Sequence, residues 1–103
     1  MITDQLFLKE INVNGFPFIV EAKADISLYK DENKIIDYPC TTLYAVLKMK
    51  SGRPAFFTAR VKQYRFESIA FLEARLILEI EEQIKTNKLE FDLYRELFKN
   101  GFE

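Results

Sequence analysis

Residues 18–29 constrain the fold more than any other part of the sequence. Every second residue from Phe18 to Leu28 is apolar, and most of the residues between them are polar. Successive side chains of a β-strand point to opposite faces of the sheet, so this pattern predicts a strand with one dry and one wet face. Sheets packed on one side only are typical of antiparallel α+β domains. We therefore expect helices on one face of the sheet and solvent on the other.

Three further segments complete the predicted sheet. Residues 6–13 are strand-like, although Leu6 and Leu8 blur the alternation. Asn14-Gly15 then predicts a hairpin turn, because both residues tolerate the positive φ of a type I′ turn. Alternation returns over residues 42–50 and again from about residue 55 to residue 64. Residues 51–54 are the predicted turn between these last two strands.

Residues 35–40 fit the strand pattern less well. Ile35 and Ile36 favour a strand, but Pro39 has no N–H to donate to a ladder of backbone hydrogen bonds. We expect an irregular or edge segment here.

Residues 68–85 form the longest segment with helical spacing, and Ser68 is the candidate N-cap. Apolar residues cover more of this helix than the ~100° arc that a surface helix requires, so it needs cover on two sides. A second helix is predicted over residues 88–99. Asn87 just before it, with Glu90 three residues later, resembles a capping box, and Asn100-Gly101 ends the helix.

These segments predict one α+β domain over residues 1–103. It consists of a four-stranded antiparallel β-meander followed by two C-terminal helices packed on one face, in the order β-β-β-β-α-α. A chain of 103 residues can bury a core of its own without disulfide or metal crosslinks.

The composition argues against several classes of site. Cys40 is the only cysteine and histidine is absent, so we expect no internal disulfide, no metal site and no cofactor. No apolar run approaches the ~18 residues of a membrane span, and the first ten residues carry acids where a secretory signal would carry bases. We expect a cytoplasmic protein that does not enter a membrane.

The net charge of -1 conceals an uneven distribution, because residues 38–66 contain six cations and no acid. By strand parity, several of these cations share the outward face of the third and fourth strands with two aromatic residues. Cations with interleaved aromatic rings suit single-stranded nucleic acid, and they also suit an acidic protein. A solvated face whose lysines protect a sheet edge is the alternative. The candidate residues of this basic hairpin are Tyr44, Lys48, Lys50, Arg53, Phe56, Arg60 and Lys62.

Catalytic chemistry is poorly supported. Glu73 falls inside the apolar arc of the first helix. It either reaches a rim or pairs with a sheet cation or a tyrosine, or it serves as a general acid or base with Tyr44 or Tyr64. Cys40 lacks a histidine to activate it, so we expect a small buried or partly exposed thiol. The acidic cluster Glu79, Glu81 and Glu82 is expected to be a wet helix face. We predict no catalytic residues and no enzyme activity.

The sequence therefore favours a small non-catalytic binding or regulatory protein, such as an accessory, inhibitor or immunity-type module, that acts through a protein–protein surface. Nucleic-acid binding by the basic hairpin is the alternative. Two helices with more apolar surface than they need also predict a homodimer formed through the helices. The aromatic residues expected to lie outside the core are Phe16, Phe56, Phe91 and Phe98.

Overall fold

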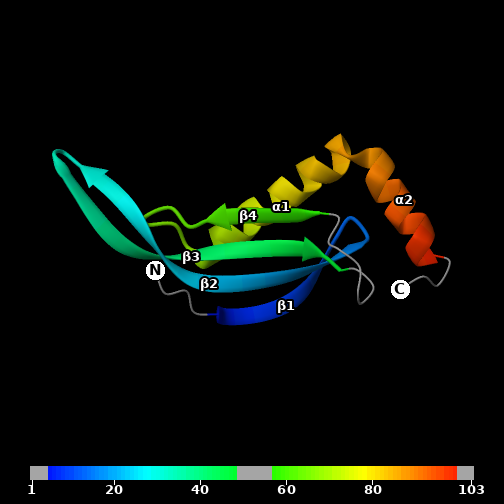
Figure 1. The fold of residues 1–103 in the computed structure, drawn as a ribbon, viewed down its shortest axis with the longest axis horizontal. Coiled ribbons are helices and arrows are strands. Elements are labelled where there is room, and N and C mark those ends of the chain that lie inside the picture. The colour runs from blue at the N-terminus through cyan, green and yellow to red at the C-terminus, as the bar shows by residue number, and fades with distance from the viewer. Residues whose placement is uncertain (1–4, 49–56, 100–103) are drawn as a thin grey trace.

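The structure, a computed structural model, describes residues 5–48 and 57–99. Four strands form a single antiparallel sheet in the order β1-β2-β3-β4, and two helices follow (Figure 1). The elements are β1 (Gln5–Val13), β2 (Phe16–Asp31), β3 (Lys34–Leu47), β4 (Thr58–Lys62), α1 (Ile69–Thr86) and α2 (Lys88–Lys99). The predicted meander with two C-terminal helices is confirmed.

The first hairpin has the turn that its sequence predicts. Asn14 and Gly15 have φ values of 54° and 87°, as a type I′ turn requires at both central positions. The turn pairs Val13 with Phe16 and sets the register of β1 against β2. Phe16 is thereby placed on the face of the sheet that the helices cover.

The core lies between α1 and one face of the sheet. The predicted parity holds, because Phe18, Val20 and Ala22 of β2 are buried beside Leu43 of β3. Helix α1 contributes one stripe of three residues at helical spacing. The other buried members of this cluster are Val13, Phe16, Ala45, Leu47, Leu72, Leu76, Ile80, Phe91 and Tyr94.

Helix α2 closes one end of the core with two aromatic residues. Phe91 meets the ring of Phe16 edge to face at 4.9 Å between centroids, and it lies 5.4 Å from the ring of Phe57. The hydroxyl of Tyr94 donates to the backbone carbonyl of Lys48. The prediction that Phe16 and Phe91 lie outside the core is therefore wrong. Phe56 and the side chain of Phe98 lie outside the described residues.

The outer half of the β2–β3 hairpin extends beyond the core as a two-stranded arm, which we define as residues 24–39 (Figure 1). Ile26 and Leu28 continue the apolar alternation of β2, but no helix covers them, and Leu28 is 70% exposed. The molecule measures 56 × 25 × 21 Å, and its radius of gyration is 16.1 Å. A compact domain of this length has a radius of gyration of about 13 Å, so the arm accounts for an elongated shape.

Of the two alternatives predicted for residues 35–40, the irregular segment is wrong, because β3 runs through it without interruption and Pro39 lies opposite Ile26. The edge alternative is confirmed, since the described pairing of β3 with β4 begins only at Thr42. The N–H of Thr41, two residues later, points to the β4 side, where it donates to the Gln63 side chain. Pro39 has the same parity, so its nitrogen faces the side where β3 has no strand partner among the described residues. The ladder with β2 therefore loses no hydrogen bond to the proline.

Both helices lie within one residue of their predicted bounds, and one of the two predicted N-caps is observed. The hydroxyl of Ser68 accepts from the N–H of Phe71 at 3.1 Å, as expected for an N-cap. Asn87 instead caps the end of α1, because its side-chain amide donates to the carbonyl of Gln83 at 3.0 Å. A capping box that joins Asn87 to Glu90 is not observed in this described part of the chain.

Candidate functional site

The connection between β4 and α1 holds the most unusual backbone in the described chain. Residues 64–67 form a tight turn in which the N–H of Glu67 donates to the carbonyl of Tyr64 at 2.9 Å. Phe66, the third residue of this turn, has a φ of 71°. Glycine or asparagine normally occupies such a position, because a bulky side chain is strained there.

The buried carboxylate of Glu67 fixes this turn. The side chain of Glu67 is only 5% exposed, and its oxygens accept from Nε and Nη2 of Arg75 at 2.6 and 2.9 Å. One of these oxygens also accepts from the N–H of Tyr64 at 2.9 Å. The hydrogen bonds from Arg75, together with that backbone N–H, lower the pKa of Glu67 despite its burial. The same pairing raises the pKa of Arg75.

Further hydrogen bonds tie the turn to the sheet. The backbone N–H of Gln63 donates to the carbonyl of Thr41, and the side-chain oxygen of Gln63 accepts from the N–H of Thr41. The side-chain amide of Gln63 then donates to the carbonyl of Glu67 at 2.7 Å. Arg75 also donates to the carbonyl of Lys62 at 2.6 Å. The turn is thus connected to β3, β4 and α1.

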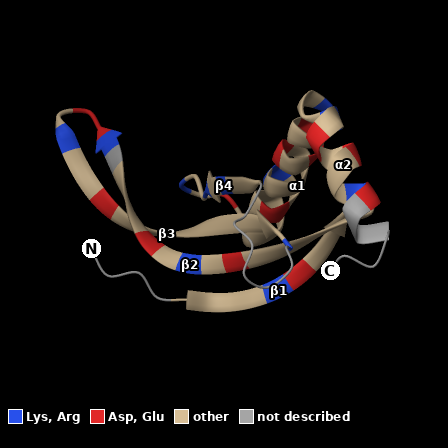
Figure 2. Cartoon of the chain, turned by 45° about the vertical axis from the view of Figure 1, so that its right-hand side comes forward, with Lys and Arg blue, Asp and Glu red and all other residues tan. Residues whose placement is uncertain are grey.

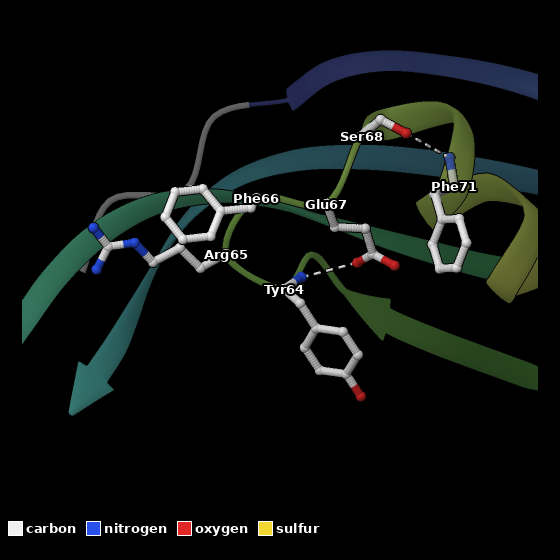
Figure 3. Close-up of a pocket in the computed structure, with 6 residues that line it drawn as sticks. All are labelled: Tyr64, Arg65, Phe66, Glu67, Ser68 and Phe71. Carbon is white, nitrogen blue, oxygen red and sulfur yellow. Dashed lines mark hydrogen bonds between the residues drawn. The ribbon is translucent and has the colours of Figure 1, made fainter. Parts of the chain in front are cut away.

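This fixed turn presents aromatic rings to solvent. Phe66 is 92% exposed and Tyr64 is 65% exposed. Their rings point away from each other around Glu67, and Phe71 lies on the far side of that carboxylate (Figure 3). Arg65 lies over the Phe66 ring at 4.9 Å, and Arg75 lies over the Tyr64 ring at 4.2 Å. We refer to Tyr64, Arg65 and Phe66 as the aromatic turn.

The aromatic turn borders an open depression of about 430 Å³. Its walls come from the three residues of the aromatic turn and from the start of α1, where the ring of Phe71 is 59% exposed. Glu67 also lines this depression, but its carboxylate is engaged by Arg75. The depression therefore presents mainly aromatic surface with a positive rim.

The basic hairpin predicted from the sequence is partly neutralised by acids of neighbouring strands. Nζ of Lys48 lies 3.0 Å from Glu10, and Nζ of Lys62 lies 3.6 Å from Asp25. A backbone hydrogen bond from Ile26 lowers the pKa of Asp25, and Lys62 lowers it further. Figure 2 shows that acidic and basic residues follow one another along β1 and β2. The strands beside the hairpin therefore do not form a uniformly basic surface.

Two other candidates of this hairpin lie on the same uncovered face of the sheet. Tyr44 pairs with Arg60 across β3 and β4, and Lys23 lies over the Tyr44 ring at 5.4 Å. Arg60 is exposed. Lys50, Arg53 and Phe56 lie outside the described residues.

The structure does not bring Glu73 together with Tyr44, one of its two partners in the catalytic alternative. Glu73 forms an ion pair with Lys9 of β1 at 3.1 Å, which is the sheet-cation pairing expected from the sequence. Tyr44 lies on the opposite face of the sheet from α1. Cys40 is buried, and its Sγ lies 3.4 Å from the hydroxyl of Ser27. Within residues 5–48 and 57–99, no group of three or more potential metal ligands occurs.

A second hollow, of about 220 Å³, lies between the two helices and the β1–β2 turn. Lys85, Lys88 and Arg95 line it, so it superficially resembles an anion site. Lys88 is paired with Asp92 at 2.7 Å, however, and Arg95 lies over the Phe16 ring at 4.5 Å. Two of its cations therefore already have partners within the chain.

Sequence reasoning missed the aromatic turn because it treated Tyr64 and Phe66 as the end of a strand and a helix boundary. A signal was nevertheless present. Connections lie on the surface, so two aromatic residues in a connection between a strand and a helix are candidates for exposure. The positive φ of Phe66 has no signal in the sequence, because no glycine or asparagine stands there.

None of the described helices is both long enough and apolar enough to cross a membrane. Comparisons with protein-family models, with curated proteins and with solved structures find no significant match to this chain.

Proposed function

We propose that this chain is a small non-catalytic binding protein of the accessory, inhibitor or immunity type, and that it recognises a protein partner through the aromatic turn. The observation that carries the proposal is Phe66, which is 92% exposed at a φ of 71° on a turn fixed by a buried ion pair. The unpaired thiol of Cys40 suits a reducing compartment, so we place this binding in the cytoplasm.

The energetics of Phe66 support a functional role. A non-glycine residue at positive φ costs about 1–3 kcal/mol, and such strain clusters at binding and catalytic sites. Because the Phe66 ring is exposed to water, burial of the ring does not offset this strain energy. Glycine would fit the backbone without strain, so the ring itself is the feature that needs an explanation.

The chemistry of the aromatic turn indicates the kind of partner. Aromatic rings and arginines are enriched among the residues that dominate protein–protein binding energies. Arg65 lies over the Phe66 ring, so the turn presents an apolar ring with an adjacent positive charge, whereas the charge of Arg75 beside Tyr64 is paired with Glu67. A partner with an apolar pocket and an acidic rim fits this surface.

Phe66→Gly provides a direct test, because it removes the ring and relieves the backbone strain. We expect immobilised wild-type protein to retain a partner from nuclease-treated native lysate and the variant to lose it. Leu89→Ala is the matched control, since Leu89 is also a highly exposed apolar residue but lies on α2. Equal recovery of the partner by wild type and Phe66→Gly would show that the aromatic turn does not bind it.

Nucleic-acid binding is the second candidate function, and one observation favours it. Tyr44, Arg60 and Lys62 share the sheet face that the helices leave uncovered, where a flat ring and cations can contact bases and phosphates. The ion pairs of Lys48 and Lys62 with Glu10 and Asp25 weigh against it. If it holds, charge reversal at Arg60 weakens binding of a single-stranded oligonucleotide, and the affinity falls log-linearly with salt.

A further inference from the structure

Helix α1 has an apolar face that the chain itself does not cover. Leu72, Leu76 and Ile80 point into the core, whereas five other apolar residues lie on the opposite side and are exposed. Phe71 and Leu78 are the largest of the five, with 59% and 64% of their surface exposed. We call these five residues the outer strip: Ala70, Phe71, Ala74, Ile77 and Leu78.

The outer strip is arranged symmetrically about Ala74. Ala70 and Phe71 lie four and three residues before it, and Ile77 and Leu78 lie three and four residues after it. On a helix with 3.6 residues per turn, Phe71 and Leu78 lie to one side of Ala74, and Ala70 and Ile77 lie to the other. Such a face is complementary to a second copy of itself that runs in the opposite direction.

In that antiparallel pair the contacts are well matched in size. Ala74 meets Ala74 of the second copy at the twofold axis, where two small side chains allow the helices to approach closely. Phe71 packs against Leu78 of the other chain, and Ala70 packs against Ile77. Each bulky residue at one end of the strip thus meets an apolar residue at the other end.

Electrostatics selects the antiparallel direction over the parallel one. Glu81 and Glu82 flank the C-terminal end of the outer strip, and Arg65 stands just before its N-terminal end. The carboxylate of Glu67 at that end is already paired with Arg75. An antiparallel pair brings the two glutamates of one chain to Arg65 and to the positive helix N-terminus of the other, whereas a parallel pair sets glutamates against glutamates.

We propose that the outer strip of α1 is the interface of a homodimer, in which a second copy of this chain packs antiparallel about a twofold axis at Ala74. This interface is isologous, as a twofold dimer requires, and it buries the large apolar residues that α1 exposes. The interface does not use Tyr64 or Phe66, which stand before the start of α1, although Arg65 and Phe71 border both the interface and the depression beside the aromatic turn.

The first test is the oligomeric state. Sedimentation of the full chain is expected to show a monomer–dimer equilibrium, and Ala74→Glu is expected to raise the dimer dissociation constant by about 100-fold or more, because it places two like charges at the axis. Leu89→Glu on α2 is the matched control and should leave the equilibrium unchanged. A wild-type chain that stays monomeric at millimolar concentration, or a dimer that tolerates Ala74→Glu, would overturn the proposal.

The second test is the direction of packing. Under mild oxidation Ala74→Cys should crosslink to itself, since the axis brings the two Cα atoms within disulfide range. A mixture of Ala70→Cys and Ile77→Cys chains should form a mixed crosslink, while neither chain alone crosslinks efficiently. Wild type is the control for the buried thiol of Cys40. Self-crosslinking of Ala70→Cys as efficient as the mixed product would indicate parallel packing and would contradict the proposed geometry.

Discussion

Phe66 combines a strained backbone with an almost fully exposed ring. The neighbouring contacts explain how the strain persists, because Glu67 is held by Arg75, by the N–H of Tyr64 and by Gln63. Arg75 belongs to α1 and Gln63 is hydrogen-bonded to Thr41 of β3, whereas Tyr64 belongs to the turn itself. The local preference of phenylalanine for negative φ is therefore overruled by the contacts around Glu67 and by the hydrogen bonds of Gln63 to β3, which the residue type at position 66 does not reveal.

Substitutions at Phe66 separate the backbone from the side chain. Phe66→Gly and Phe66→Ala both remove the ring, but only glycine adopts positive φ without strain. We expect the free energy of unfolding of the glycine variant to exceed that of the alanine variant by about 1 kcal/mol. Alanine at positive φ keeps a strain penalty of about 1–2 kcal/mol. Glycine avoids this strain but loses about 0.5–1 kcal/mol through its greater conformational freedom in the unfolded chain. Urea unfolding measures the difference. Equal stabilities would indicate that the turn does not require positive φ.

Glu67 should make stability depend on pH in the acid range. Its pKa is lowered from the ordinary value of 4.5, so the folded protein binds fewer protons there than the unfolded chain. Its contribution to stability is complete above about pH 4.5 and is lost as the pH falls through the lowered pKa. We expect Glu67→Gln to cost about 1–3 kcal/mol at pH 7, because it leaves Arg75 without its carboxylate.

The same substitution provides the pH test. The difference in unfolding free energy between wild type and Glu67→Gln should shrink as the pH is lowered from 5 to 2, when measured by urea unfolding at each pH. If the difference in unfolding free energy stays constant from pH 5 to pH 2, the Glu67 carboxylate has the same pKa in the folded protein and in the unfolded chain.

At the scale of elements, the alternation of β2 predicted the buried face but not where burial ends. Phe18, Val20 and Ala22 are buried as expected, whereas Ile26 and Leu28 follow the same pattern and are exposed. Length explains the difference. The 16 residues of β2 extend about 54 Å, and the 18 residues of α1 extend about 27 Å. Periodicity reports which face a residue occupies and carries no information about how far a covering helix reaches.

This mismatch predicts unequal protection along one strand. An isolated two-stranded ribbon is marginally stable in water, so amides of the arm at residues 26–38 should exchange with solvent through local opening. Amides of residues 18–22 and 43–47 are packed under α1 and should exchange only on global unfolding. Hydrogen–deuterium exchange resolved by residue makes the comparison. Equal protection in both halves would show that another surface stabilises the arm.

At the scale of the whole molecule, the proposed dimer allows a charge-swap experiment in two different chains. Arg65→Glu, and separately the pair Glu81→Lys with Glu82→Lys, each place like charges at both ends of the symmetric interface. Each should weaken its own homodimer by about tenfold, since exposed ion pairs contribute up to about 1 kcal/mol each and the contact occurs twice. Sedimentation of each variant alone gives these values.

Mixing the two charge variants is the decisive measurement. A heterodimer then has opposite charges at both ends, so association should return to the wild-type level. Failure of the mixture to associate more tightly than either variant alone would show that these charges act within one chain.

The candidate sites were less predictable than the fold, for a physical reason. Strand parity correctly placed Tyr44 and Arg60 on the uncovered face, because parity is a local property. It could not reveal that Lys48 and Lys62 meet Glu10 and Asp25, since those acids belong to strands that are distant in sequence. The charge of a single segment describes a surface poorly when its neighbours carry the opposite sign.

The proline in the middle of β3 also bears on aggregation. Along the arm, the outer edge of β3 has no strand partner among the described residues, and Ile35 and Ile36 lie exposed beside it. An unpaired edge with exposed apolar residues could template pairing with other chains. Pro39 offers no N–H on that edge, so an incoming strand cannot continue its ladder past this point. One residue that costs the native sheet no hydrogen bond thereby limits the growth of intermolecular β-structure along the exposed arm.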